Sequence, residues 1–255
     1  MRIRTAGARA ACATRRVSSP TLVKPAYIGL ATLGLGLVAG PLLAHEEDIE
    51  EVVVTGRATS LIGVAASASQ GLIGKEDLSA RPTLRAGELL EVIPGAAVTQ
   101  HSGPGKANQY FLRGFNLDHG TDFAAFVDGV PLNLPTHGHG QGYLDLNPVI
   151  PELVRTVDFG KGPYYADIGD FSSAGYARYT LDEELARPLI KATVGENGFY
   201  RTVLAGSRGF GEETAVLAAL ELQQYDGPWQ LDNDAAKVNG FVRASTHLGD
   251  TYLSL

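Results

Sequence analysis

Residues Phe111–Pro131 read FLRGFNLDHGTDFAAFVDGVP and carry most of the local information about the fold. Two short apolar runs, Tyr110–Leu112 and Phe123–Val127, are followed by the turn dipeptides Arg113-Gly114 and Asp128-Gly129. Asp-Gly accepts the positive φ angles of a two-residue hairpin turn, so the second run predicts a tight β-hairpin. Arg113-Gly114 predicts a strand that ends where the backbone closely approaches another segment. The stretch therefore predicts a compact, turn-rich α+β element.

Short elements are also expected on both sides of this stretch. We expect a strand at Leu72–Gly74 and a helical turn at Lys75–Leu78, followed by a helix over Leu84–Ile93 that stops at Pro94-Gly95. Further strands are expected at Val98–Gln100 and Val154–Phe159. In the second of these, alternation places Arg155, Val157 and Phe159 on one face. Residues 132–142 form a loop rich in Gly, Pro and His.

The pattern changes from Leu189 onward to longer segments in which apolar residues alternate with polar ones. These segments are Leu189–Val194, Phe199–Ser207, Thr214–Tyr225, Ala236–Leu248 and the residues from Thr251 onward. In the third segment Val216, Ala218, Leu220 and Leu222 share one face. Such segments are typical of a transmembrane β-barrel, although a soluble antiparallel sheet would show the same alternation. Because about four strands cannot close a barrel of about eight or more, we expect the chain to be a truncated product or a partial record.

The amino-terminal residues have the pattern of an exported protein. Residues 1–44 hold six of the 21 basic residues and no acid, and the apolar run Tyr27–Val38 follows the basic start. This order predicts a secretory signal peptide, with an uncleaved membrane anchor as the alternative. The single cysteine, Cys12, lies in this leader, so no disulfide framework is expected after it. The remaining 15 basic residues face 28 acidic ones, a balance of about −13 that excludes nonspecific nucleic-acid binding.

An acidic run and a β-branched segment come next. Residues 45–51 are mostly acidic, and Val52-Val53-Val54-Thr55-Gly56 follows before a linker of small and polar residues that ends at Gly71. The β-branched segment is either the first strand of the next domain or an extended segment that pairs with the exposed edge of a partner.

Five motifs in this order resemble the plug domain of the TonB-dependent outer-membrane receptors. They are ELLEVIPG (Glu88–Gly95), FLRGF (Phe111–Phe115), VDGVP (Val127–Pro131), VIPEL (Val149–Leu153) and Lys161-Gly162-Pro163. The resemblance covers about Ile49–Tyr165 and departs from the family pattern over Tyr165–Gly175, where Asp167 and Asp170 are extra. The small residues Ser172–Gly175 are still expected to allow close packing against a surrounding wall.

The resemblance implies an α+β plug domain followed by the first antiparallel strands of an incomplete transmembrane β-barrel. The domains would be a signal peptide (1–44), an acidic, coupling and linker region (45–71), the plug (72–182) and the first barrel strands (185–255). It also implies a receptor in the outer membrane of a Gram-negative cell that moves a scarce nutrient (a metal, a metal chelate or a similar small ligand) into the periplasm. The implied partners are TonB, outer-membrane lipid and the nutrient, with no resident cofactor. The alternatives are a plug that senses the ligand without transporting it and a soluble periplasmic binding domain.

The resemblance also assigns roles to particular residues. Pairing with the energy-coupling protein TonB would involve Glu51, Val52, Val53, Val54 and Thr55. The plug scaffold would involve Arg113, Gly114, Asp128, Gly129, Lys161, Gly162 and Pro163.

The histidines are the candidate ligand contacts, and no catalytic motif accompanies them. Neither G-x-S-x-G nor H-E-x-x-H occurs, so no enzyme activity is expected. His137 and His139 share the loop at 132–142, and His101 and His119 lie on neighbouring loops with carboxylates of Asp145, Asp167 and Asp170 available. Neutral imidazole is a common ligand of zinc, nickel and copper. The four histidines are therefore candidates for metal or small-ligand contact, or they merely populate a solvated loop.

Overall fold

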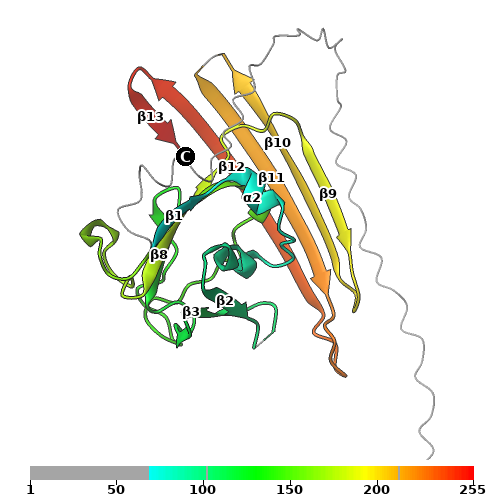
Figure 1. The fold of residues 1–255 in the computed structure, drawn as a ribbon. Helices are drawn as coiled ribbons and strands as arrows, with labels where there is room; N and C mark the ends of the chain where they lie inside the picture. The colour runs from blue at the N-terminus through cyan, green and yellow to red at the C-terminus, as the bar shows by residue number, and fades with distance from the viewer. Residues whose placement is uncertain (1–68, 102, 212) are drawn as a thin grey trace, which may run out of the picture. The chain divides into compact units, whose positions relative to one another are not determined.

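The computed structural model describes residues 69–255, apart from residues 102 and 212. We call residues 69–182 the globular part and the strands after them the long-strand sheet (Figure 1). The helical elements of the globular part are α2 (Lys75–Ser79) and the 3-10 helices η1 (Ala86–Val92), η2 (Pro151–Leu153) and η3 (Ala166–Ile168). Its strands are β1 (Gln70–Ile73), β2 (Ala96–Thr99), β3 (Gln109–Leu112), β4 (Phe115–Asn116), β5 (Phe123–Val127), β6 (Val130–Pro131), β7 (Val154–Lys161) and β8 (Gly175–Leu181).

Two sheets make up the globular part. The larger has the order β1-β7-β8-β5-β6, and the smaller has the order β2-β3-β4. All of the pairings are antiparallel except β5 with β8, which run parallel from the pair Phe123–Gly175 to the pair Val127–Tyr179. This parallel pairing is possible because the long segment between β5 and β8 crosses back to the start of β5.

Both dipeptides in the opening stretch form two-residue hairpin turns. Asp128 and Gly129 have φ angles of 48° and 82° between β5 and β6, as predicted. Arg113 and Gly114 have φ angles of 52° and 82° between β3 and β4. The close backbone approach expected there occurs at Arg113, whose N–H donates to the Gly95 carbonyl at 2.8 Å, whereas a Cβ added at Gly114 would meet nothing within 4 Å. The glycine is needed instead because the hairpin turn requires a positive φ.

Close backbone packing occurs at Gly175, but inside the globular part. A Cβ at Gly175 would lie 2.4 Å from the carbonyl oxygen of Gly160 and 3.2 Å from the Cα of Lys161. Both neighbours belong to β7, which pairs with β8. Ser172–Gly175 were expected to pack closely against a surrounding wall. At Gly175 this expectation is wrong, because the close contact is with β7 of the same sheet.

The expected helix over Leu84–Ile93 is shorter than predicted and is a 3-10 helix. It begins at Ala86 and ends at Val92, with hydrogen bonds from Glu88 to Arg85 and from Ile93 to Leu90 that span three residues. A Cβ at Gly87 would lie 2.1 Å from Asn108 Oδ1, so the glycine allows the helix to pack against Asn108.

The hydrophobic core is shared by the globular part and the long-strand sheet. Leu89, Tyr110, Phe123 and Val157 are buried in the same cluster as Leu217 of the long-strand sheet. In β7 the register shifts between Val154 and Thr156, which places Val154 in the core together with Val157 and Phe159. Strict alternation assigned Val154 to the opposite face from these two, and the bulge explains the difference.

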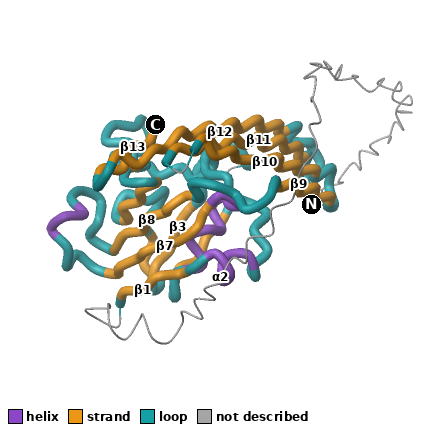
Figure 2. Tube along the Cα trace, turned by 90° about the horizontal axis from the view of Figure 1, so that it is seen from above, coloured by secondary structure: helices purple, strands orange, loops and turns teal. Residues whose placement is uncertain are grey.

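The long-strand sheet is antiparallel throughout and has the order β13-β12-β11-β10-β9 (Figures 1 and 2). Its strands are β9 (Leu189–Val194), β10 (Tyr200–Phe210), β11 (Thr214–Tyr225), β12 (Ala235–Leu248) and β13 (Thr251–Ser254). The predicted bounds of β9 and β11 are confirmed, and the other strands differ from their predicted bounds by a few residues. Within the described residues the sheet is open, because β9 and β13 each pair with one neighbouring strand.

The two faces of the long-strand sheet have opposite character. Leu204 pairs with Ile190 and Leu220 on one face, and all three side chains are exposed, Ile190 to 78%. On the other face Arg201 and Glu221 are buried at 3% and 1% exposure. The covered face also carries Val203 and Leu217 of the core. A water-soluble sheet exposes its charges, whereas this sheet exposes an apolar face and buries charges beside its core residues.

Among residues 69–255, apart from the two undescribed positions, no helix is long and apolar enough to cross a membrane.

Candidate functional site

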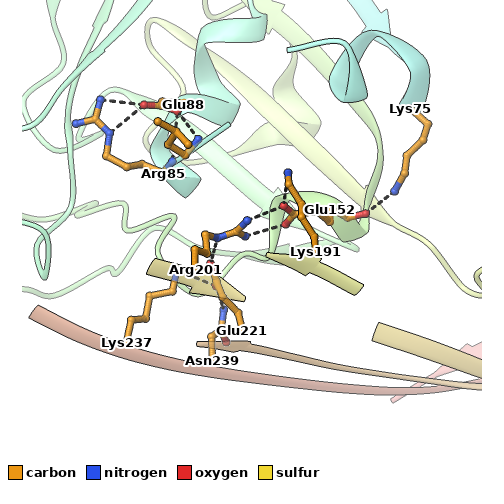
Figure 3. Close-up of polar contacts among 10 residues, drawn as sticks. Lys75, Arg85, Glu88, Glu152, Lys191, Arg201, Glu221, Lys237 and Asn239 are labelled. Carbon is orange, nitrogen blue, oxygen red and sulfur yellow. Dashed lines mark hydrogen bonds and ion pairs between the residues drawn. The ribbon is translucent and has the colours of Figure 1, made fainter. Parts of the chain in front are cut away.

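The globular part is joined to the long-strand sheet by an ion pair between Glu152 and Arg201 (Figure 3). Glu152 lies in η2, whose first residue Pro151 starts the turn with a favourable fixed φ. Arg201 lies on the covered face of β10. Its Nη1 donates to Glu152 Oε1 at 2.6 Å and its Nη2 donates to Oε2 at 2.8 Å. The planar guanidinium thus binds both carboxylate oxygens, which is the strongest geometry for such a pair.

This ion pair belongs to a larger buried network. Arg201 Nε donates to Glu221 Oε1 at 2.7 Å, and Lys237 Nζ lies 2.8 Å from Glu221 Oε2. Lys191 Nζ donates to Glu152 Oε1 at 2.9 Å. The four neighbouring strands β9, β10, β11 and β12 therefore each contribute one charged residue to this cluster (Figure 3).

Two further contacts connect this network to the globular part. Asn239 Nδ2 donates to the backbone oxygen of Pro148 at 2.7 Å. Lys75 Nζ donates to the backbone oxygen of Glu152 at 2.6 Å and pairs with Asp182 at 2.5 Å. The segment around η2 is therefore held by polar contacts both from its own domain and from the sheet.

Glu152 stays ionised because its partners outweigh its burial. Burial by itself raises the pKa of this carboxyl, but hydrogen bonds and positive charge from Arg201, with a further hydrogen bond from Lys191, lower the pKa from 4.5 to about 2. The carboxylate is thus charged throughout the physiological range. Removing either side of this pair would leave the remaining charge with fewer partners, Arg201 with Glu221 or Glu152 with Lys191.

A second ionic link joins the predicted hairpin to the sheet. Arg243 of β12 donates from Nη1 to Asp128 Oδ2 at 3.1 Å, and the same nitrogen lies 3.3 Å from the backbone oxygen of Leu181. Asp128 Oδ1 also accepts from the backbone N–H of Leu181 at 3.1 Å. Asp128 thus shapes its own turn and contacts two other elements.

The remaining predicted scaffold residues lie near the start of β1. Arg113 Nη2 donates to Ser69 Oγ at 2.8 Å, and the N–H of Lys161 donates to the Ser69 carbonyl at 3.0 Å. Burial, and then the charge of Arg113, lower the pKa of Lys161, whose ammonium lies 5.6 Å from the Phe159 ring. Gly162 has a φ of 93° in the turn that follows, and Pro163 is exposed. Asp167, which the sequence marked as unusual, pairs with Arg178 at 2.7 Å.

All four predicted histidines meet in one cluster of loops. His119 follows β4 and is buried, and its ring lies 4.5 Å from that of His139 and 5.0 Å from that of His101. His137 stacks on Tyr143 at 3.9 Å, and the Tyr143 ring lies 5.3 Å from that of His119. The predicted carboxylates Asp145, Asp167 and Asp170 do not belong to the candidate metal-binding group, in which Asp118 takes part instead.

Asp118 and Asn133 are two residues that the sequence did not single out. Asp118 adjoins His119 and extends its carboxylate toward His139 at 3.4 Å. Asn133 is buried, its Oδ1 accepts from the N–H of Ala125 at 2.8 Å, and its Nδ2 contacts backbone carbonyl oxygens of three other residues. These oxygens belong to Gly120, Phe123 and Gly142, at 3.1, 2.9 and 2.9 Å. A lone Asn in a Gly-rich loop carries no sequence signal for such a role. Arg201 and Glu221, in contrast, could have been identified from the sequence as charges opposite the apolar face of their strands.

A cleft of about 920 Å³ lies between the histidine cluster and one end of the long-strand sheet. His101 and Gln100 line it from the globular part, and Phe199, Tyr225 and Trp229 line it from the sheet and its loops. Because His101 also stacks on His119, the cleft borders the histidine cluster.

The predicted leader and the segment Glu51–Gly56 lie outside the described residues, so their roles remain predictions.

Comparisons with known proteins point in one direction. A family model described as "TonB-dependent Receptor Plug Domain" matches residues 48–176, about half of the chain. The fold is similar to the siderophore receptor PirA from Pseudomonas aeruginosa, with a TM-score of 0.51 and 18% identity over 74% of this chain and 35% of that one. It is similar to the copper transporter OprC, with a TM-score of 0.56 and 18% identity over 74% and 30% of the two chains.

A third similar structure is the pyoverdine outer-membrane receptor FpvA from Pseudomonas aeruginosa PAO1 bound to pyoverdine. Its TM-score is 0.56, with 16% identity over 73% of this chain and 26% of that one. At these identities the likeness establishes the fold. The chain spans about a third or less of the length of these three solved structures.

Proposed function

Because the chain belongs to the family of TonB-dependent receptor plug domains, we propose that it is part of an outer-membrane receptor that takes up a scarce nutrient into the periplasm. The globular part is the plug, and the long-strand sheet is the adjoining part of the membrane-spanning wall. Receptors of this family are outer-membrane transporters of Gram-negative bacteria and are not enzymes. We further propose that the nutrient is a metal, a metal chelate or a similar small ligand, and that TonB supplies the energy.

The exposed apolar face of the long-strand sheet carries this proposal. Its exposed face holds Ile190, Leu204, Leu220 and Val242, whereas its covered face holds the network around Arg201. An apolar outer band and a polar interior are what a wall between lipid and a filled lumen requires. The same sheet in water would expose its apolar face without compensation.

The ion pairs between the globular part and the long-strand sheet support a plug that stays in place until TonB does work on it. The links Glu152–Arg201 and Asp128–Arg243 each connect the globular part to a strand of the wall. Separating these partners before water reaches them would leave charges unpaired in the interior, so such links oppose displacement of a dry plug. If water enters as the plug moves, both charges of a pair become hydrated, so displacement is reversible.

The coupling segment Glu51–Thr55 is proposed to receive the force. An extended segment that adds a strand to TonB would be loaded along its length, and the linker would transmit that load to the plug. The outer membrane holds no ATP, so energy has to arrive through such a mechanical contact.

A proline substitution in the coupling segment tests this proposal. In the full-length receptor, Val53→Pro should abolish uptake and leave ligand binding unchanged, because proline removes a backbone donor and disturbs strand pairing. Ser60→Pro, in the linker, is the matched control and should leave uptake intact. Uptake is measured as growth of a receptor-deletion strain that carries each variant, under depletion of zinc, of copper or of iron in separate cultures.

Normal uptake by the Val53→Pro variant would overturn the coupling role. A wild-type receptor that binds its ligand but restores growth under none of the depletions would favour sensing without transport. Recovery of the protein in the periplasmic fraction would overturn the membrane assignment.

A further inference from the structure

Asp118, His119 and His139 bring three ligand atoms of metal-binding type to one point. One atom from each of these residues lies within 4.8 Å of the other two. Asp118 Oδ1 is 3.8 Å from His119 Nε2, and Asp118 Oδ2 is 3.4 Å from His139 Nε2. In a tetrahedral zinc site with bonds of about 2.0–2.1 Å, neighbouring ligand atoms are roughly 3.3 Å apart. The observed separations, up to 4.8 Å, exceed this value, so the three groups are gathered at one point but have to move closer together to bind a metal.

The protonation of His119 suits a metal ligand. Its Nδ1 lies 3.0 Å from the backbone oxygen of Asn108. A carbonyl oxygen can only accept, so Nδ1 carries a proton, and Nε2 is the nitrogen left to bind a metal. This Nε2 lies 3.8 Å from Asp118 Oδ1. Histidines that bind metals commonly donate their other N–H to a backbone carbonyl, which fixes both the tautomer and the ring orientation.

The two loops that bear the ligands are fixed by one side chain. Asn133 Nδ2 contacts the carbonyl of Gly120, next to His119, and the carbonyl of Gly142, near the end of the His139 loop. The His139 loop is also closed by backbone hydrogen bonds between Leu134 and Tyr143 and between Gly142 and Leu134, at 2.9 and 2.8 Å. A site held in this way does not have to be assembled by the metal.

His139 supplies the adjustable part of the site. Its side chain is 49% exposed, whereas that of His119 is 4% exposed. The exposed ring has room to adjust when a metal enters, whereas the buried ring is held in place. Three protein ligands leave a fourth position open to water or to a donor atom of a bound molecule.

We propose that Asp118, His119 and His139 bind a divalent transition-metal ion, with zinc or copper favoured by two imidazoles and one carboxylate. Magnesium and calcium prefer oxygen ligands alone and should not compete. That this metal is also the transported nutrient, free or held by a small chelator in the open position, rests on the uptake function proposed above. The neighbouring cleft, lined by His101, is the route by which the metal would arrive.

Direct metal titration tests the site. The full-length receptor is purified in detergent without a histidine tag, stripped with a chelator, and titrated with Zn²⁺ alone and with Mg²⁺ alone. Cobalt(II) is then added as a spectroscopic probe, because a four-coordinate Co²⁺ ion with histidine ligands absorbs visible light more strongly than the hydrated ion. We expect one Zn²⁺ per chain, no competition from Mg²⁺, and an intense Co²⁺ spectrum.

The variants His139→Ala and Asp118→Ala should each weaken Zn²⁺ binding at least about tenfold. His247→Ala is the control, since it removes an exposed histidine of β12 that lies outside the three-residue group, and it should bind Zn²⁺ as the wild type does. His139 is exposed, so its variant should keep the wild-type thermal unfolding temperature and lose affinity alone.

Two results would overturn the inference: no Zn²⁺ binding by the wild type, or equal Zn²⁺ binding by the wild type and the His139→Ala variant. Failure of the uptake function is distinguishable from both. A receptor that restores growth but binds no Zn²⁺ retains the uptake function and loses the metal site. A receptor that binds Zn²⁺ through His139 but supports no growth retains the metal site and loses uptake.

Discussion

Arg201 in β10 and Glu152 in η2 are 49 residues apart in sequence and form a two-pronged ion pair between the long-strand sheet and the plug, with N–O distances of 2.6 and 2.8 Å. Their side chains are 3% and 11% exposed. The sheet residue carries the positive charge and the plug residue the negative one. Glu221 contacts the same guanidinium, so one arginine bridges two carboxylates, each of which also pairs with a lysine.

Removing the Glu152 carboxylate should destabilise the protein strongly. We expect Glu152→Ala to lower the free energy of unfolding by roughly 3–5 kcal/mol, because the buried cation Arg201 loses two of its three charged contacts. Denaturant titration in detergent measures the change. Glu183→Ala is the control: its pair with Arg155 is long, 3.9 Å, and half exposed, and should be worth about 1 kcal/mol or less. Equal effects of the two substitutions would contradict a special role for Glu152.

Acid should weaken the same contact. The pKa of Glu152 is about 2 in the folded protein against 4.5 unfolded, so the folded state favours the charged form. The stabilisation is fully present above the unfolded pKa, about 4.5, and is lost as pH falls toward about 2, by on the order of 3 kcal/mol. In denaturant titrations at decreasing pH, the stability difference between wild type and Glu152→Gln should shrink across this window. A difference that does not change with pH would rule out titration of Glu152 as its source.

Two substitutions at Asp128 separate the contribution of its turn backbone to stability from the contribution of its charge. Asp128 has a φ of 48° and its carboxylate contacts Arg243. Asp128→Asn keeps a side chain that tolerates this φ and loses the charge, whereas Asp128→Ala loses both. We therefore expect the alanine variant to be less stable than the asparagine variant by about 1 kcal/mol, measured by denaturant titration. If the two variants were equally stable, the turn would contribute nothing beyond the ion pair.

Asn133 should be more sensitive than its place in a loop implies. Asn133→Ala leaves the buried N–H of Ala125 and nearby carbonyl oxygens without their partner, and we expect a loss of roughly 3 kcal/mol. Asn147→Ala is the matched control, because its amide makes a single weaker contact of 3.3 Å to Lys106 and is less buried. The loss should be accompanied by weaker Zn²⁺ binding, since Asn133 holds both ligand loops. Unchanged stability and unchanged Zn²⁺ binding would refute its positioning role.

A charged residue introduced on the exposed apolar face tests whether that face contacts lipid or water. Leu204 is 41% exposed and lies between Ile190 and Leu220. In water Leu204→Arg would be nearly neutral, but in a bilayer it should oppose insertion by about 2–4 kcal/mol near the midplane. The yield of folding into lipid vesicles measures this, and Asp250→Arg, in the turn after β12, is the control that should insert normally. Wild-type insertion by the Leu204→Arg variant would argue against a lipid-facing surface.

Local features of the fold could be predicted from sequence because their causes lie within a few residues. Asp128-Gly129 predicts its hairpin since both residues tolerate positive φ, and the alternation in Thr214–Tyr225 predicts β11 since the side-chain period of a strand is two. The helix over Leu84–Ile93 was predicted less well, because its observed form depends on packing of Gly87 against Asn108 elsewhere in the chain. The strand end before Arg113-Gly114 was predicted, but the hairpin that β3 forms with β4 was not.

The sequence alone determined the order of the elements and the two-faced strands, both of which depend on composition and short-range periodicity, and the signal peptide at the amino terminus remains a prediction. The tertiary structure decided which of the two faces is covered, because that depends on where the plug lies against the sheet. It also decided that Glu152 meets Arg201 and that Asp118 and His119 meet His139. These contacts join residues on different elements, and no local propensity specifies which of several charged or histidine side chains will come together when the chain folds.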